Sequence, residues 1–329
     1  MGSEYRPPFT VSTAAINLIA EISGLIERYV IRLEQADGLK LRKANRIKTI
    51  YSSLAIEGNT LSEDEVRDVI NGKTVIAPMR QLQEVRNAIR AYDLYPKLDA
   101  FKEKDLLKAH SVMMEALVPE AGHYRSQGVG VFGEQGLVHM APPHAMVPQL
   151  MGNLFGWLKN SEDHLLIRSC VFHYEFEFIH PFLDGNGRMG RLWQSLILGK
   201  LNPVFEFLPV ENMVHANQQR YYDAIMQSGA LADCGPFIDF MLGEISASLK
   251  AHQKKDVGVN VGINVGISER KVLEAIARDA AVTARQLSAM LGVTERQCER
   301  LLAKLKRAGI IQRIGPNKGG SWRLTDTNS

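Results

Sequence analysis

Apolar side chains recur with helical spacing along most of the chain. Residues three and four apart are apolar, with polar residues between them, and this period predicts amphipathic helices. The expected helices cover about residues 12–33, 39–57, 79–98, 104–117, 146–159, 162–179, 188–198, 211–228 and 235–253. The pattern therefore predicts a mainly α-helical protein in which packed helices bury a common core.

The segment 122–148 departs from this period. Val129 and Val131 precede, and Leu137 and Val138 follow, a turn of sequence Gly-Glu-Gln-Gly. Apolar residues on both sides of a glycine-containing turn predict a short β-hairpin. The exposed edge of such a hairpin can pair with an extended segment of another chain.

A second break comes at His180, where the chain reads HPFLDGNGRMGR. Pro181 cannot continue the preceding helix, and turn residues run from Asp184 to Gly187 before a helical pattern resumes at Arg188. The sequence therefore predicts a helix, a tight loop and the N-terminus of a new helix. Free N–H groups and the helix dipole make such a terminus an anion-binding site.

The side chains of this loop add chemistry to the anion site. Arg188 and Arg191 are three residues apart and share one helix face, where they can hold two phosphate groups. Asp184 offers hard oxygen ligands to a Mg²⁺ ion that shares those phosphates. His180 lies where the loop begins, and histidine is the side chain that most often serves as a general base near neutral pH.

The full string resembles the signature of the Fic family, His-Pro-Phe-x-Asp/Glu-Gly-Asn-Gly-Arg-x-x-Arg, and every fixed position matches. The resemblance implies a Fic-type helical core with a short β-hairpin flap. It also implies an enzyme that transfers AMP from ATP to a hydroxyl side chain of a protein. In this reading His180 is the catalytic base, Asp184 holds Mg²⁺ (or Mn²⁺) with ATP, and Phe182 anchors the loop. The implied phosphate-binding residues are Gly185, Asn186, Gly187, Arg188 and Arg191.

Two further segments resemble the family. The hairpin follows Tyr124-Arg125 as the Fic flap does, so Val129, Val131, Leu137 and Val138 are expected to align an extended target segment. A purely structural hairpin over the core is the alternative. The pair Tyr221-Tyr222 resembles the family's sequence near the adenine pocket, although aromatic rings at helical spacing more often belong to a core.

The segment Ser53 to Gly58 matches the inhibitory motif Ser/Thr-x-x-x-Glu-Gly/Asn of one class of Fic proteins. Ser53 and Glu57 are four residues apart and so share a helix face. The resemblance implies a salt bridge from Glu57 to Arg191, which then no longer holds the γ-phosphate. We therefore expect a largely self-inhibited protein; a solvated glutamate at a helix C-terminus is the alternative.

A metal site is an alternative for the helix that leads into the motif. His173, Glu177 and His180 recur at positions i, i+4 and i+7, a spacing that suits zinc ligands on one helix face. No zinc-protease pattern accompanies them, and Glu177 equally suits a salt bridge.

The composition is that of a soluble protein without disulfides or membrane-spanning segments. The chain has 329 residues, of which 23% are charged, as is ordinary for a soluble protein of two or three domains. Cys170, Cys234 and Cys298 are far apart and indicate neither a disulfide framework nor a cysteine metal site, so we expect a cytoplasmic location. No apolar run reaches membrane-spanning length, and we expect no membrane partner.

The C-terminal part differs from the rest in charge. Residues 268–329 contain 12 Lys and Arg against 6 Asp and Glu, a net charge of +6, while the remainder carries −3. Three helical patterns and two short strand patterns there predict a winged helix-turn-helix domain. The expected DNA-binding residues are Arg296, Arg300, Lys304, Arg307 and Lys318. A winged helix that binds protein is the alternative.

These observations predict a helical region with the inhibitory motif (1–100), a Fic catalytic core (101–255), a glycine-rich linker (256–267) and a winged-helix domain (268–329). The preferred function is a self-inhibited protein adenylyltransferase that modifies a Tyr, Ser or Thr hydroxyl of a target protein or of itself. The alternatives are a DNA-binding transcriptional regulator whose Fic core senses nucleotide, and a de-AMPylase. The target and the oligomeric state are left open.

Overall fold

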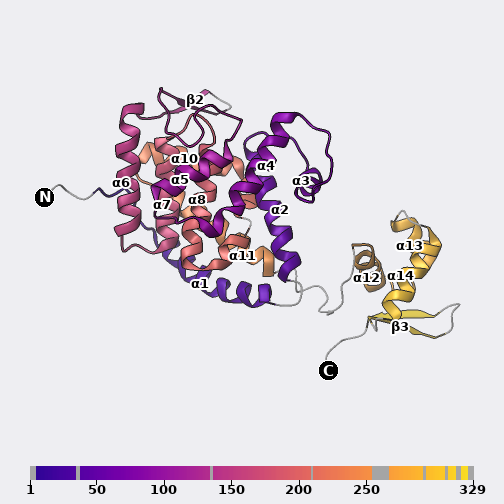
Figure 1. Ribbon diagram of the computed structural model, residues 1–329. Coiled ribbons are helices and arrows are strands. Elements are labelled where there is room, and N and C mark those ends of the chain that lie inside the picture. Colours follow the sequence, from indigo (N-terminus) through magenta and orange to yellow (C-terminus); the bar gives the residue numbers. More distant parts are fainter. Residues whose placement is uncertain are drawn as a thin grey trace. The chain divides into compact units, whose positions relative to one another are not determined.

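The computed structural model describes residues 5–34, 38–133, 136–208, 210–253, 267–291, 294–307, 310–315 and 320–324. The chain divides into two compact units, residues 1–253 and 254–329, and each has its own hydrophobic core. The first unit is mostly helical, and the second combines helices with a two-stranded sheet (Figure 1). The prediction of a mainly α-helical protein is therefore confirmed.

The first unit is a series of helices with short connections. The α-helices are α1 (Thr13–Glu34), α2 (Gly38–Ile56), α3 (Glu63–Ile70), α4 (Met79–Asp93), α5 (Glu103–Met113), α6 (Val147–Asn160), α7 (Leu165–Ile179), α8 (Asn186–Leu201), α9 (Val210–Ala216), α10 (Gln218–Leu231) and α11 (Gly235–Gln253). Short 3₁₀ helices lie at η1 (Tyr95–Lys97), η2 (His144–Met146) and η3 (Pro203–Phe207). In the described part of the chain, no helix combines the length and the hydropathy that a membrane crossing requires.

Helices α7 and α8 lie at the centre of this unit. Helix α7 is apolar on nearly every side, and a helix of that kind has to be covered all round. Its neighbours are α6, α8 and α11. Phe172 and Phe176 on α7 and Trp193 on α8 are fully buried. The loop between α7 and α8 is thus held by two helices that are fixed in the core.

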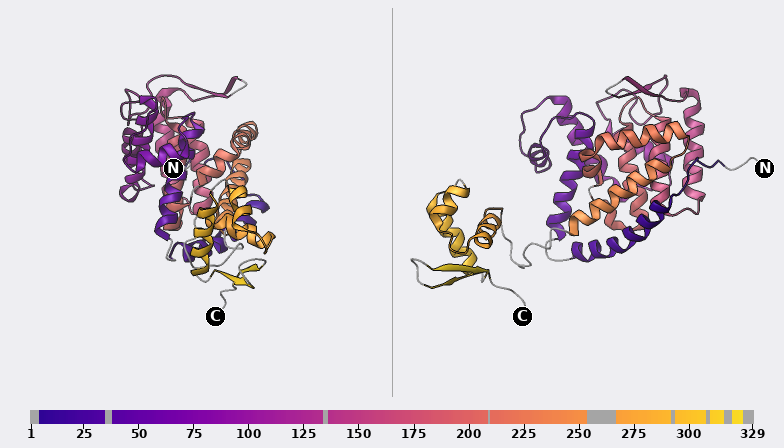
Figure 2. Two further views of the ribbon diagram at one scale, coloured as in Figure 1. Left: turned by 90° about the vertical axis from the view of Figure 1, so that its right-hand side faces the viewer. Right: turned by 180° about the vertical axis from the view of Figure 1, so that it is seen from behind.

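A β-hairpin forms where the sequence predicts one. Strands β1 (Gly130–Gly133) and β2 (Gly136–Met140) are antiparallel, and Val131 pairs with His139. The register shifts between Val131 and Phe132, which indicates a β-bulge. The hairpin lies at the outer edge of the first unit in all three ribbon views (Figures 1 and 2).

Two of the predicted helices differ most from those in the structure. The helix predicted over 79–98 ends at Asp93, because Pro96 has no N–H to donate and disfavours helical geometry in the residue before it. The helix predicted over 211–228 is interrupted at Asn217, whose φ of −121° and ψ of 33° are not helical. Both segments had apolar spacing that fits one longer helix.

The second unit has the order of elements of a winged helix. Helices α12 (Ile267–Arg278), α13 (Ala284–Leu291) and α14 (Glu295–Arg307) precede an antiparallel pair of strands, β3 (Ile311–Ile314) and β4 (Ser321–Leu324). A separate apolar core includes Val272, Leu287, Cys298 and Leu302.

Candidate active site

The loop between α7 and α8 presents a helix N-terminus beside His180. His180 ends α7 in the left-handed conformation, with φ 49° and ψ 61°, which is costly for a residue other than glycine. Gly185 begins α8 with φ +87°, and a Cβ there would lie 2.6 Å from Sδ of Met114. Both the conformation and the space therefore require glycine. The N–H groups in the first turn of α8 have no carbonyl partner within the helix and are available to an anion.

Phe182 and His110 anchor this loop. Phe182 is fully buried, and its ring stacks on His110 with centroids 3.6 Å apart. Nε2 of His110 donates to the carbonyl of Asp184 at 3.0 Å, and Nδ1 accepts the N–H of Gly122 at 2.9 Å. Burial lowers the pKa of His110 to about 4, so the ring is neutral and makes both bonds. Sequence reasoning missed His110, since one histidine on a helix face carries no signal of its own.

Arg125 ties the hairpin to the end of α7. It is buried, and its Nε donates to the carbonyl of His180 at 2.8 Å, while its backbone N–H donates to Pro181 at 2.9 Å. The guanidinium also donates to the carbonyls of Gln127 and Pro142, on either side of the hairpin. Burial lowers the pKa of Arg125. One side chain thus fixes both the candidate flap and the candidate base.

The side chain of Asn186 bonds the backbone of its own loop. It is buried, its Oδ1 accepts the N–H of Phe182 and its Nδ2 donates to the carbonyl of Phe182, both at 2.9 Å. The amide therefore closes the loop on itself. A phosphate at this turn can still be contacted through backbone N–H groups such as those of Asn186 and Gly187.

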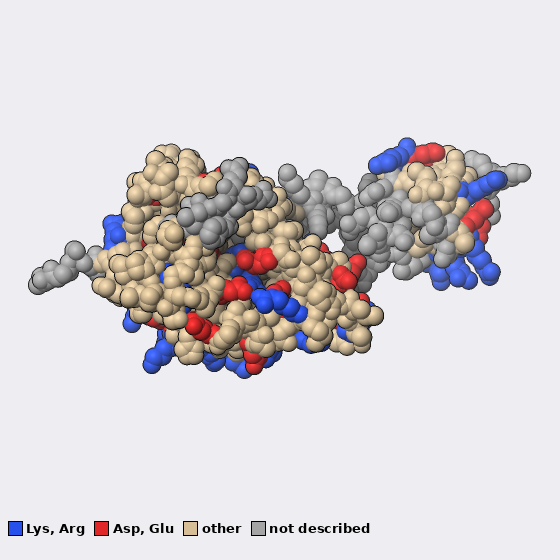
Figure 3. Space-filling view, turned by 90° about the horizontal axis from the view of Figure 1, so that it is seen from above, with Lys and Arg blue, Asp and Glu red and all other residues tan. Residues whose placement is uncertain are grey.

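Asp184 lies at the mouth of the loop with a side chain that is 36% exposed. Its Oδ1 accepts from Arg188 at 2.7 Å and from the N–H of Gly185 at 2.6 Å, and its Oδ2 is 3.5 Å from Arg80 on α4. Figure 3 shows acidic and basic side chains side by side on one face of the first unit. Among the described residues, no three His, Cys, Asp or Glu side chains gather as a metal site. Asp184 fits Mg²⁺, which takes few protein carboxylates and completes its shell with phosphates and water.

Arg191 forms hydrogen bonds with Ser53 of helix α2 and with Glu57, which follows the last residue of that helix. Its Nη2 is 2.8 Å from Oε1 of Glu57 and 2.9 Å from the carbonyl of Ser53, and its Nε donates to the Ser53 hydroxyl at 3.2 Å. Gly187 leaves room for this contact, because a Cβ there would lie 2.3 Å from Oε1 of Glu57. The carboxylate of Glu57 thus lies against the first turn of α8, where an anion would bind.

Behind Arg191, α7, α8 and α10 share a buried polar network. The ring nitrogens of His173 contact Oε1 of Gln194 at 2.7 Å and the hydroxyl of Tyr221 at 3.1 Å. Neither nitrogen is left for a metal ion, which argues against the zinc alternative. Tyr221 is buried here, which corrects the expectation that it faces adenine; Tyr222 is 43% exposed.

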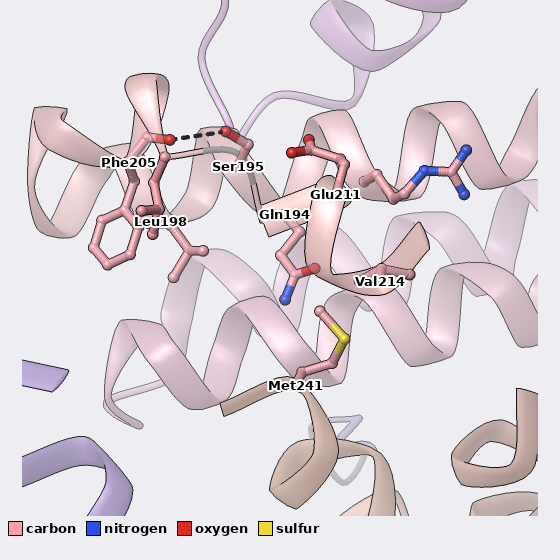
Figure 4. A pocket seen from close by; sticks show the side chains of 9 residues that line it. Gln194, Ser195, Leu198, Phe205, Glu211, Val214 and Met241 are labelled. Atoms are coloured by element: carbon pink, nitrogen blue, oxygen red, sulfur yellow. Dashed lines mark hydrogen bonds between the residues drawn. The ribbon is translucent and has the colours of Figure 1, made fainter. Parts of the chain in front are cut away.

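A small cavity lies on the inner side of Arg191. Its volume is about 10 Å³, roughly the size needed for one water molecule. Figure 4 shows Gln194 and Glu211 among the residues around it. Glu211 accepts from the hydroxyl of Tyr92 at 3.3 Å, and burial raises the pKa of Glu211 to about 7. A nucleotide cannot fit in this cavity, so the outer side of Arg191 is where a phosphate can approach.

The other predicted residues lie on the hairpin and in the second unit. Val129 is half-buried just before β1, Val131 lies in β1, and Leu137 and Val138 lie in β2. Arg296, Arg300 and Arg307 are exposed on α14, and Lys304 lies on the same helix. Lys318 lies outside the described residues.

Comparison with known proteins decides the family. Residues 98–198 match the model described as Fic/DOC family, and residues 267–312 match the model described as winged helix-turn-helix DNA-binding. A solved Fic family protein from Desulfovibrio desulfuricans G20 is 42% identical, with 99% of this chain and 100% of that one covered and a TM-score of 0.76. The chain belongs to the Fic family.

Curated Fic relatives match a smaller part of the chain. Protein adenylyltransferase Fic of Culex quinquefasciatus is 31% identical over 219 residues, which are 62% of this chain and 41% of that protein. Protein adenylyltransferase fic-1 of Caenorhabditis elegans is 30% identical over 218 residues, 62% of this chain and 40% of that protein. This chain thus spans about two fifths of the length of these relatives. A solved Fic-1 structure from C. elegans, at 21% identity and a TM-score of 0.58, shares the fold.

Proposed function

We propose that this Fic chain transfers AMP from ATP to a hydroxyl side chain of a protein, and that Glu57 holds it inactive. The observation that supports the proposal is the loop before α8, in which His180 ends α7, Asp184 bonds Arg188, and the helix N-terminus that follows can bind an anion. The names of the curated relatives, protein adenylyltransferases, support the same activity.

In the proposed reaction His180 accepts the proton of the target hydroxyl, whose oxygen attacks the α-phosphorus while pyrophosphate leaves. The N–H groups at the start of α8 and the two arginines stabilise negative charge on the phosphate oxygens. Asp184 would hold Mg²⁺ or Mn²⁺, which neutralises phosphate charge when bound. The hairpin would align an extended target segment, or a segment of this chain, by strand addition.

Self-inhibition follows from the partner of Arg191. While the carboxylate of Glu57 lies at the first turn of α8, an arriving γ-phosphate meets a negative charge in place of a free guanidinium. ATP then binds without the contact that orients it for attack. Withdrawal of α2 or removal of the Glu57 carboxylate is expected to release the enzyme.

The experiment uses ATP labelled at the α- or γ-phosphate, with Mg²⁺ and a cell lysate as the source of targets. Glu57→Gly should transfer α-label, and Glu57→Gly with His180→Ala should be about 10²–10⁴-fold slower. Chelation of Mg²⁺ should abolish the transfer. Transfer of γ-label would indicate phosphate transfer instead, and transfer that does not depend on His180 would contradict the proposed base. Release of AMP from a premodified target by the wild type would favour de-AMPylation.

The second unit supports DNA binding as an additional function. Arg296, Arg300 and Arg307 are exposed on α14, and the segment matches a DNA-binding winged-helix model. Full-length protein should shift DNA in a gel, and Arg296→Ala with Arg300→Ala should lower the slope of log affinity against log salt by about two. No shift at low salt would contradict DNA binding. A regulator that only senses nucleotide would bind DNA in an ATP-dependent way and transfer no AMP.

We also expect this Fic chain to act in the cytoplasm, where its three free thiols, all buried, stay reduced.

A further inference from the structure

Glu177 is a buried acid to which the proposed reaction gives no role. It lies in the last turn of α7, three residues before His180, and its side chain is 13% exposed. Its Oε1 has no hydrogen-bond partner among the described residues. A buried carboxylate oxygen without a partner is costly, and such groups in folded proteins commonly have a functional reason.

Two glycines of α8 bring Glu177 next to the inhibitory ion pair. A Cβ at Gly190 would lie 2.6 Å from Oε1 of Glu177, just as a Cβ at Gly187 would lie 2.3 Å from Oε1 of Glu57. Because Gly187 and Gly190 are three residues apart, the two carboxylates lie over neighbouring positions on one face of α8. Nη1 of Arg191 is 3.0 Å from the Cβ position of Gly187. Two acids thus lie near one guanidinium, and Glu57 is the one that binds it.

The groups around Glu177 keep it neutral while Glu57 is in place. Burial raises the pKa of Glu177 to about 8, with the charge of Arg191 lowering it and that of Glu57 raising it. On α7 it faces Nε2 of His173 at 3.9 Å, but burial lowers the pKa of His173 to about 4, so that ring carries no charge. Tyr221 on α10 is also neutral, because burial raises its pKa. Glu57 therefore neutralises Arg191, and Glu177 keeps its proton.

We propose that Glu177 is a positioning residue that forms a salt bridge with Arg191 when Glu57 leaves. One edge of the guanidinium then stays fixed while another edge faces the ATP phosphates. Withdrawal of Glu57 removes the partner of Arg191 and the repulsion on Glu177 together. Both changes favour an ionised Glu177 that pairs with Arg191. A guanidinium has donors on more than one edge and can bind a carboxylate and a phosphate together. This inference rests on the proposed function for the roles of Glu57 and Arg191.

ATP binding to the full chain tests this inference. All variants carry His180→Ala, so that no transfer occurs, and Glu177→Gln is compared with and without Glu57→Gly. Glu177→Gln removes the charge and keeps the shape of the side chain. With Glu57→Gly it should weaken ATP binding about tenfold at pH 8, and with Glu57 intact it should change binding less than about twofold. The tenfold difference should shrink as the pH falls and Glu177 becomes protonated.

Two results would overturn the inference. An equal loss of affinity in both backgrounds would show a merely structural role, and no loss with Glu57→Gly would show that Arg191 does not need Glu177. Glu177→Asp, which keeps the charge, should restore part of the affinity, and thermal unfolding of each variant monitors folding. This experiment measures ATP binding, whereas the proposed activity is tested by AMP transfer. A failure of one proposal can therefore be told from a failure of the other.

Discussion

The two arginines of the motif lie three residues apart on one helix, yet their surroundings differ. Arg188 pairs with Asp184 from its own loop, and its Nε is buried without a hydrogen-bond partner among the described residues. Arg191 is bonded by Ser53 and by Glu57, which is 134 residues away in the sequence. The pair of Arg188 with Asp184 needs only the folded loop, whereas the contacts of Arg191 with Ser53 and Glu57 also need α2. The contact between Glu57 and Arg191 can therefore be lost without loss of the loop.

The largest expected effect is the loss of ATP affinity when Arg188 or Arg191 is replaced, and this loss should depend on Glu57 only for Arg191. Arg188→Met should weaken ATP binding about 10–100-fold with or without Glu57, because its phosphate contact does not depend on α2. Arg191→Met should weaken binding by a similar factor only in the Glu57→Gly background, since Glu57 already occupies Arg191 in the wild type. Calorimetric titration with Mg²⁺ and ATP, with His180→Ala in every variant, measures both factors. The same loss of ATP affinity for Arg191→Met in both backgrounds would contradict the proposed difference between the two arginines.

Glu175 is a buried acid that forms no salt bridge with an arginine among the described residues, and it shows what burial alone does to a carboxyl group. Glu175 on α7 is 7% exposed and accepts from the hydroxyl of Tyr5 at 3.2 Å, and burial raises its pKa from 4.5 to about 7. The folded protein then binds more protons than the unfolded chain between these values, so stability falls as the pH rises through that window. Glu175→Gln should flatten this fall and stabilise the protein at pH 7.5 by on the order of 2 kcal/mol.

Urea unfolding at pH 5.5 and pH 7.5 measures the effect of Glu175→Gln. Glu27→Gln, the same change at an exposed acid on α1, is the matched control for the loss of one carboxylate. An unchanged slope for Glu175→Gln would mean that Glu175 titrates as it does in the unfolded chain.

Ser53→Ala gives the smallest of these effects. It removes the hydroxyl that accepts from Nε of Arg191 but keeps the backbone carbonyl and the Glu57 pair. We expect a loss of about 1 kcal/mol in stability and a two- to fivefold rise in AMP transfer, roughly the contribution of one hydrogen bond. Ser52→Ala, at the neighbouring buried serine, should cost stability without a rise in transfer. An equal rise for both variants would mean that looser packing, rather than the arginine contact, activates the enzyme.

Local signals in the sequence predicted the path of the backbone through the loop better than the contacts that hold the loop in place. Pro181 and the glycines indicate where the backbone must turn, so the sequence predicted the order of helix, loop and helix. The pairing of Glu57 with Arg191 was predicted from a recognisable motif. His110 and Arg125 act through contacts with distant carbonyls, which no spacing reveals. The bonds of the Asn186 amide to the backbone of Phe182 are likewise not evident from the sequence. The non-helical backbone of Asn217 interrupts a helix, and apolar periodicity does not record it.

The central claim is that the carboxylate of Glu57 restrains a competent active site. The most direct test is the ratio of initial AMP-transfer rates of Glu57→Gly and wild type at saturating Mg²⁺ and ATP with the same target protein. The account predicts a ratio of at least about ten, because the variant frees one charge-assisted phosphate contact. A ratio near one, with active transfer by both proteins, would contradict it.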